Sequence, residues 1–186
     1  MGTAWLTAYR MLFVQSGLRP GQTMLVQGAS GGVSTALIAL GKAAGMRVWV
    51  TGRTEQKRQL AAKLGADGTF ESGARLPERV DGVFETVGRA TWSHSMKSVK
   101  PGGAVVISGA TSGDATAAEL QRLFFLQLRV IGSTMGTKAE LADLLSFCAQ
   151  AKIRPTIGAE LPFEKAEQGL RTVLDGETAG KVVLVR

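Results

Sequence analysis

The sequence contains very little cysteine or histidine. Cys148 and His94 are the single representatives of these two types among 186 residues. One cysteine excludes an internal disulfide, and one cysteine with one histidine cannot supply the ligands of a tetrahedral zinc site. We therefore expect no metal site in this chain and a core position for Cys148. His94 either lies at the surface or caps a helix, or else takes part in proton transfer.

Long apolar segments are absent as well. No run approaches the roughly 18–20 residues that span a bilayer, and no apolar leader opens the chain. With 45% hydrophobic and 20% charged residues, the composition is typical of a soluble globular chain of one domain, or of one domain with part of a second. These features predict a cytoplasmic protein without membrane association.

Acidic residues are missing from the first 54 positions. Five basic residues precede Glu55, namely Arg10, Arg19, Lys42, Arg47 and Arg53. They account for five of the seven net positive charges. No Lys/Arg cluster is interleaved with aromatic residues, so we expect no specific nucleic-acid partner. The excess charge is either a solvated surface or a favourable field for a polyanionic cofactor.

Strand-like and helix-like segments alternate along most of the chain. The apolar runs predict strands at 23–27, 47–51, 80–86, 104–108 and 128–132. Helical patterns fall at 4–17, 33–44, 55–64, 91–98, 117–125 and 138–151. Continuous apolar runs are typical of parallel strands that are covered on both faces. The order predicts an α/β fold with a doubly wound parallel sheet in three αβα layers, the Rossmann fold.

The last segment changes in character. It carries expected strands at 153–157 and 181–185 and a helix at 164–174. We therefore expect one domain at 1–152, including the linking helix 4–17, and a tail at 153–186. The tail either extends the sheet or belongs to a second domain.

A glycine-rich loop, Gly-Ala-Ser-Gly-Gly, follows the first expected strand and opens a long helix. Gly31 and Gly32 let the backbone approach a ligand closely, and Ser30 can add a hydroxyl. The helix N-terminus offers free N–H groups and a positive dipole end to a diphosphate. The strict G-x-G-x-x-G pattern is not kept, because its three positions fall on Ala29, Gly31 and Ser34. The place of the loop within a strand–helix–strand unit nevertheless predicts a dinucleotide site.

The end of the second expected strand bears on the choice of cofactor. Dinucleotide sites for NAD usually place Asp or Glu there to bind the ribose hydroxyls. This chain has Gly52 and Arg53 instead, and Lys57 lies one helical turn further on. Arg53 can pair bidentately with a 2′-phosphate or stack on adenine. This pattern predicts NADP(H) as the cofactor.

Several segments resemble the medium-chain dehydrogenase/reductase superfamily, and in particular its quinone oxidoreductase-like, zinc-independent NADPH-dependent reductases. They are LTAYRMLF (6–13), PGQTMLVQGASGGVSTALIALGKAAG (20–45), LGAD (64–67), ETVG (85–88), KPGGAVVISGATSG (100–113), FFLQLRVIGSTMG (124–136) and GKVVLV (180–185). The resemblance covers essentially the whole chain, and the segments follow in the family's order.

The resemblance implies which positions line the cofactor site. The positions implied for the diphosphate, the 2′-phosphate and a ribose are Ser30, Gly31, Gly32, Val33, Gly52, Arg53, Lys57, Thr86 and Val87. The positions implied for the nicotinamide end are Thr7, Gly109, Ala110, Thr111, Phe125, Ser133, Thr134 and Met135. We assign no catalytic residue to this chain.

The resemblance also implies an activity, which is hydride transfer from NADPH to a quinone, an enone or a related activated carbonyl or alkene. Alternatives are a zinc-type alcohol dehydrogenase, an enoyl reductase module, and a nucleotide-binding or sensing module without catalysis of its own. Family members carry an N-terminal substrate domain that this chain lacks, so we expect little turnover by the chain alone. Residues 128–134 are an expected edge strand, and the family pairs such edges, which predicts a homodimer.

Overall fold

Six parallel strands form the central sheet of the computed structural model, which describes residues 1–114, 117–175 and 180–186. The strands are β1 (Thr23–Gln27), β2 (Arg47–Gly52), β3 (Gly68–Glu71), β4 (Val80–Glu85), β5 (Val99–Ile107) and β6 (Arg129–Gly132). Their spatial order is β3-β2-β1-β4-β5-β6. The order reverses between β1 and β4, and such a switch point opens a crevice at the carboxyl ends of the strands.

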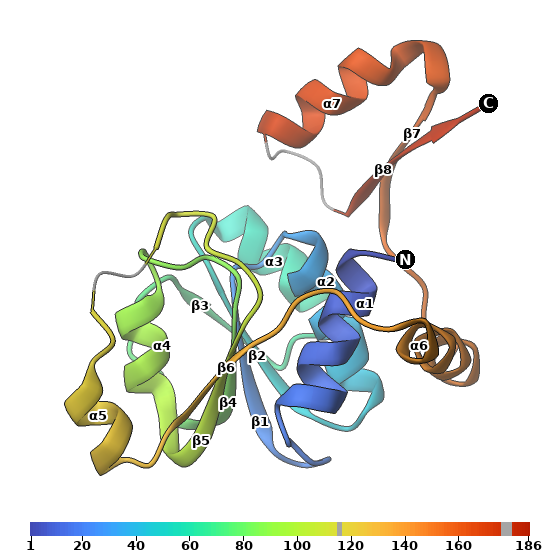
Figure 1. Ribbon diagram of the computed structural model, residues 1–186. Helices are drawn as coiled ribbons and strands as arrows, with labels where there is room; N and C mark the ends of the chain where they lie inside the picture. The colour runs from blue at the N-terminus through green and yellow to red at the C-terminus, as the bar shows by residue number, and fades with distance from the viewer. Residues whose placement is uncertain (115–116, 176–179) are drawn as a thin grey trace.

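Helices cover both faces of this sheet (Figure 1). One apolar core contains residues of α1 (Ala4–Tyr9), α2 (Gly32–Ala43), α3 (Glu55–Lys63) and α6 (Lys138–Ala151). The other core contains residues of α4 (Trp92–Ser98) and α5 (Leu120–Phe125). Within β1, Met24 and Val26 belong to the first core and Leu25 to the second, as expected for a strand buried on both faces. The predicted three-layer Rossmann fold is confirmed.

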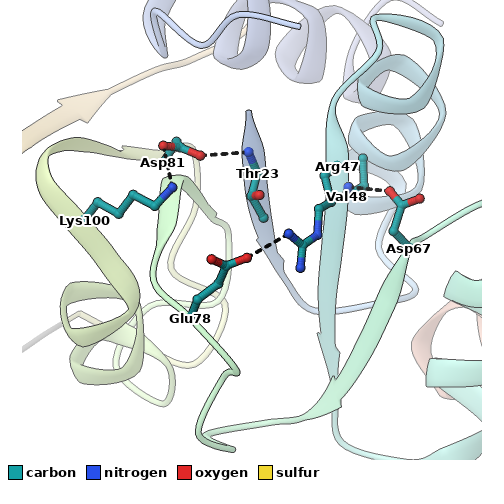
Figure 2. Close-up of polar contacts among 7 residues, drawn as sticks. All are labelled: Thr23, Arg47, Val48, Asp67, Glu78, Asp81 and Lys100. Carbon is teal, nitrogen blue, oxygen red and sulfur yellow. Dashed lines mark hydrogen bonds and ion pairs between the residues drawn. The ribbon is translucent and has the colours of Figure 1, made fainter. Parts of the chain in front are cut away.

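Carboxylates fix the amino ends of the strands, at the edge opposite the crevice (Figure 2). Asp81 accepts a hydrogen bond from the Thr23 N–H at 2.8 Å and one from the Lys100 ammonium at 2.9 Å. Asp67 accepts from the Val48 N–H at 2.7 Å. These bonds satisfy N–H groups where the ladders begin, and they hold β1 in register with β4 and β2 in register with β3.

The linking helix and the edge strands differ from the sequence expectation. Helix 4–17 is α-helical only to Tyr9, and a π-helix, η1 (Arg10–Gln15), completes it. Strand β3 was not expected, because Phe70 is the single large apolar residue of its four and the strand pairs only with β2. The structure also begins α5 at Leu120, after Glu119 in a left-handed conformation.

The prediction of a strand at 153–157 is wrong. The structure has β7 at Ile157–Pro162. Ile153 instead packs against the first core and donates its N–H to the Cys148 carbonyl at 3.0 Å. Pro155 has no N–H to contribute to a ladder. The segment therefore completes the end of α6 before the chain becomes extended.

Strand β7 pairs in parallel with β8 (Lys181–Val185) in a separate two-stranded sheet. A short 3₁₀ turn, η2 (Phe163–Lys165), and helix α7 (Ala166–Asp175) connect them on the described part of the chain. Figure 1 shows this unit apart from the six-stranded sheet. Among the described residues, no helix has both the length and the apolar character to cross a membrane.

Candidate functional site

A cavity of about 550 Å³ opens at the carboxyl ends of β1, β2 and β4. Its volume lies in the range of small-molecule sites. Ten predicted positions line it, namely Ser30, Gly31, Gly32, Val33, Gly52, Arg53, Lys57, Thr86, Val87 and Thr111. The fold thus brings together loops that are separated by up to 80 residues in the sequence.

The glycine-rich loop forms the floor of this cavity. Gly28 has a φ of +85°, a conformation that favours glycine. Gly31 precedes α2 in an extended conformation, and no side chain caps the helix there. The first N–H groups of α2 are therefore available to a ligand, and the positive end of the helix dipole favours an anion.

Lys181 lies over the same helix terminus. A Cβ placed on Gly32 would come within 2.9 Å of the Lys181 Nζ and 3.2 Å of the Ala4 Cβ. The ammonium of β8 therefore adds a full positive charge beside the glycine-rich loop. Sequence reasoning did not identify Lys181, because about 150 residues separate it from the loop.

Two cations lie at the end of the cavity formed by β2 and α3. Arg53 and Lys57 line the cavity, and neither has an ion-pair partner within the described ranges. By contrast, Arg58 bonds to Glu55 at 2.7 Å and to the Gly52 carbonyl at 2.9 Å. The acidic residue nearest to Arg53 in the sequence, Glu55, is thus engaged elsewhere, and the hydrogen bond from Arg58 lowers its pKa.

The opposite wall consists of two loops bonded to each other, residues 86–91 and 109–113. The Ser112 Oγ donates to the Val87 carbonyl at 2.6 Å and accepts from the Ala90 N–H at 3.0 Å. Gly88 has a φ of +89°, and a Cβ there would lie 2.5 Å from the Gly113 carbonyl oxygen. This close backbone approach requires glycine and keeps the wall compact.

A second cavity, of about 410 Å³, lies at the carboxyl ends of β5 and β6. Ser133 and Thr134 line it, together with Ser108 and Arg10. The Oγ atoms of Ser108 and Ser133 are buried and have no hydrogen-bond partner among the described residues. Buried hydroxyls are normally satisfied, so these two can pair with an ordered water or with a polar group of a ligand.

The remaining predicted positions lie in four places. A Cβ placed on Gly109 would lie 3.2 Å from the Thr86 carbonyl oxygen, so Gly109 packs closely against that carbonyl. Ala110 packs closely against Gly88, where a Cβ would lie 2.9 Å from the Ala110 Cα. Met135 follows the second cavity at a φ of +46°. Thr7 is buried in α1, where its hydroxyl donates to the Thr3 carbonyl at 2.8 Å. Phe125 is not brought together with the others, because it is 76% exposed at the end of α5, beside Arg79.

Sequence reasoning missed several residues that line the first cavity. They are Gly28, Ala29, Ser34, Ser72, Ala90, Thr91 and Ser112. Gly28, Ala29 and Ser34 lie in the glycine-rich segment itself, so their proximity in sequence was the available signal. Ser72 follows β3, the strand that the sequence did not reveal.

Comparisons with known proteins agree with this architecture. Residues 32–150 match the family described as zinc-binding dehydrogenase. The acryloyl-coenzyme A reductase of Metallosphaera sedula is 33% identical over 177 residues, which cover 91% of this chain and 52% of that protein. The quinone oxidoreductase of Mus musculus is 28% identical over 205 residues, which cover 100% of this chain and 61% of that protein. A solved NAD-dependent alcohol dehydrogenase matches at a TM-score of 0.90 and 33% identity, over 100% of this chain and 57% of that one.

The family match covers more than half of the chain. The chain therefore belongs to the zinc-binding dehydrogenase family, within the medium-chain dehydrogenase/reductase superfamily, as its cofactor-binding part. The relatives named above are oxidoreductases. The chain spans between 52% and 61% of their length.

The described residues do not fit the zinc of the family name. No three His, Cys, Asp or Glu side chains in this part of the chain lie together as a metal-binding group. Cys148 is buried in α6, where burial raises the pKa of its thiol, and this confirms its place in the core. His94 bonds to Gln27 at 2.9 Å and to the Ala74 carbonyl at 2.9 Å. It is half-buried and held by these two bonds, and it does not cap α4, whose N-cap residue is Thr91.

Proposed function

We propose that this chain is the cofactor-binding part of an NADPH-dependent oxidoreductase that transfers hydride to a quinone, an enone or a related activated carbonyl or alkene. The observation that carries the proposal is the pair Arg53 and Lys57 beside the uncapped N-terminus of α2. A 2′-phosphate and a diphosphate are the two anionic groups that such an arrangement fits.

The residues of the cavity would act by binding and orienting the cofactor. NADPH, when bound, supplies a hydride from its nicotinamide ring. The α2 N-terminus at Gly31 and Gly32, with Lys181, would hold the diphosphate, and Arg53 and Lys57 would hold the 2′-phosphate. The wall formed by residues 86–91 and 109–113 would exclude water from one side.

The nicotinamide end would lie toward the second cavity. The unpartnered Oγ atoms of Ser108 and Ser133 offer polar contacts there. Gly109 and Ala110, with Thr134 and Met135, would complete this end, and Thr7 lies in the helix that packs on α2. Phe125 is left out of the proposed site because the structure places it beside Arg79.

The names of the relatives support an activated alkene or a quinone as the substrate, and two alternatives to this function are a zinc-type alcohol dehydrogenase and a binding or sensing module. Acryloyl-coenzyme A is an activated alkene, and the quinone oxidoreductase is named for a quinone. A zinc-type alcohol dehydrogenase would need its metal ligands from outside the described residues. A binding or sensing module would hold the dinucleotide without turnover. Because the chain spans about half of its relatives, we infer that it binds NADPH but turns over little or no substrate alone.

The cofactor assignment is tested by fluorescence titration of the chain with NADPH and NADH. We expect tighter binding of NADPH. Arg53→Ala should weaken NADPH binding by about 1–3 kcal/mol, because it removes a charged hydrogen-bond donor, and should leave NADH unchanged. Arg19→Ala is the control, since it removes one exposed positive charge from the loop before β1, away from the cavity.

Each other outcome of this titration has a definite meaning. Tighter binding of NADH would overturn the assignment and favour an NAD site, as in the alcohol dehydrogenase of similar structure. Equal losses for both cofactors would place Arg53 away from the 2′-phosphate. Consumption of NADPH with a quinone by this chain would favour an enzyme over a binding module and would contradict the expected lack of turnover by the chain alone.

The proposal includes an assembly and a location. Strand β6 ends the sheet, so its outer backbone groups are free to pair with a second copy, and we propose a homodimer. We place the protein in the cytoplasm, where a free cysteine such as Cys148 stays reduced.

A further inference from the structure

Glu85, the last residue of β4, is fully buried and accepts hydrogen bonds on both carboxylate oxygens. Its Oε1 accepts from the N–H of Val87 at 2.8 Å and of Gly88 at 3.1 Å. Its Oε2 accepts from the Ser95 hydroxyl at 2.6 Å. The Thr91 hydroxyl donates between the two oxygens, at 2.8 Å from Oε1 and 2.9 Å from Oε2. All four partners donate, and a carboxylate, which accepts on both oxygens, matches them.

A line of buried hydrogen bonds connects this carboxylate with the glycine-rich loop. The Ser95 Oγ accepts from the Gln27 Nε2 at 2.9 Å, and the Gln27 Oε1 accepts from the Thr51 hydroxyl at 2.6 Å. The Thr51 Oγ1 in turn accepts from the Gly28 N–H at 3.4 Å. Gln27, Thr51 and Ser95 are fully buried. The network therefore runs beneath the cavity from the loop after β1 to the loop after β4.

His94 sets the direction of this line. Its Nε2 faces the Ala74 carbonyl, which can only accept, so the Nε2 carries the hydrogen. Its Nδ1 is then the acceptor for the Gln27 Nε2. This contact orients the Gln27 amide, with nitrogen toward Ser95 and oxygen toward Thr51. The tautomer follows from the hydrogen-bond partners.

We propose that Glu85 is a positioning residue for the dinucleotide, a role that rests on the function proposed above. Glu85 does not line the cavity, but Thr86, Val87, Ala90 and Thr91 do. Glu85 binds the backbone at 87 and 88 and the side chain of Thr91, so it shapes that wall. Fully satisfied buried networks hold one conformation, and through Gln27 this network holds the wall at a fixed distance from Gly28.

Glu85→Gln tests the proposal with a side chain of the same shape. The two backbone N–H groups keep the amide oxygen at the Oε1 position, so the amide nitrogen takes the place of Oε2. There it donates where the Ser95 hydroxyl also donates, and the line of hydrogen bonds loses its acceptor. The dissociation constant for NADPH should rise by about tenfold, the factor that corresponds to one lost hydrogen bond. Ser95→Ala is a second variant, which keeps the carboxylate and removes the link to Gln27, and it should weaken binding by less.

Asp81→Asn is the matched control. Asp81 is a carboxylate of the same strand that also accepts from a backbone N–H, but it lies at the amino end, away from the cavity. A general loss of stability would be shared by both variants. The positioning role instead predicts that, at temperatures where both variants are folded, NADPH affinity falls in Glu85→Gln and stays unchanged in Asp81→Asn. Equal losses in the two variants, or unchanged affinity in Glu85→Gln, would overturn the proposal.

Amide hydrogen exchange without ligand separates this proposal from the proposed function. The Val87 and Gly88 amides should exchange faster in Glu85→Gln than in the unmodified chain or in Asp81→Asn, because a neutral amide oxygen in place of the carboxylate Oε1 is a weaker acceptor. Unchanged exchange at both amides would refute the positioning role whatever the cofactor. If the two amides exchange faster in Glu85→Gln but the unmodified chain binds no NADPH, the role of Glu85 in holding the wall stands and the cofactor assignment is rejected.

Discussion

Asp67 shows how a single side chain sets the start of a strand. Its carboxylate accepts from the Val48 N–H at 2.7 Å and from the Lys42 ammonium at 2.6 Å. Its own N–H donates to the Val48 carbonyl at 2.7 Å. Partial burial raises its pKa, but the bonds from Lys42 and Val48 outweigh that effect and leave the pKa lowered. The folded state therefore favours the charged form.

The contribution of Asp67 to stability should depend on pH. Because the folded-state pKa is lowered, the contribution is complete above the unfolded-state pKa and is lost as the pH falls through the folded-state pKa. Asp67→Asn should lower the free energy of unfolding by about 1 kcal/mol at pH 7, and the difference should shrink below about pH 4. Urea denaturation at several pH values measures it.

Glu78→Gln is the control for this experiment, because the Arg47–Glu78 pair is about half exposed (Figure 2). Exposed ion pairs contribute little, so this variant should lose less than about 0.5 kcal/mol. The link to ionisation would be refuted if the free energies of unfolding of Asp67→Asn and the unmodified chain differed by the same amount from pH 7 to pH 3.5.

At the scale of elements, α2 and α6 begin in opposite ways. Helix α2 has no side-chain cap, and its N-terminus faces the cavity. Helix α6 begins with a capping box, in which Thr137 and Glu140 each accept a hydrogen bond from the other's N–H. Glu140 also binds Arg10 of η1 at 2.7 Å, which joins the two helices. The helix that faces a candidate ligand site leaves its terminus open, whereas the structural helix closes it with its own side chains.

Loss of the cap on α6 should weaken the fold without affecting the cavity. Thr137→Ala should lower the free energy of unfolding by about 1 kcal/mol, the usual cost of removing such a cap. Ser146→Ala, an exposed position of the same helix, should have little effect. Thermal unfolding monitored by circular dichroism compares the two. A Thr137→Ala variant as stable as Ser146→Ala would show that the capping box contributes nothing measurable.

At the scale of the whole molecule, two edges close the six-stranded sheet. Strand β3 forms one edge and β6 the other. The β6 edge carries Val130, which is 39% exposed. An open edge of unpaired backbone groups can pair with another strand, and a charged side chain on the edge discourages that pairing.

The proposed homodimer is measured by light scattering of the purified chain. We expect a mass of two chains, and Val130→Lys should shift the distribution toward the monomer of 19.6 kDa. Leu145→Lys on α6 is the control, because Leu145 is exposed to a comparable degree, at 49%. A monomeric unmodified chain would reject the dimer, and dissociation by Leu145→Lys alone would place the interface on α6.

Local patterns were sufficient to predict most elements. The apolar run at 23–27 became β1, and the helical pattern at 138–151 became α6, with unchanged bounds. Such signals depend on neighbouring residues, so they can be read along the chain. The strand at 153–157 failed because the contact of Ile153 with the core, a tertiary contact, outweighed its β-propensity.

The sequence by itself determined the doubly wound fold, the glycine-rich loop and the basic end of β2. These depend on residues near one another in the chain, whose spacing limits the local backbone. Only the tertiary structure brought Lys181 to Gly32 and joined Glu85 to Gln27 through Ser95. It also left the hydroxyls of Ser108 and Ser133 without partners among the residues that the structure describes. Such contacts join distant segments, and their geometry depends on how the whole chain packs. The same packing placed Phe125 beside Arg79, away from the nicotinamide end that the family resemblance had implied for it.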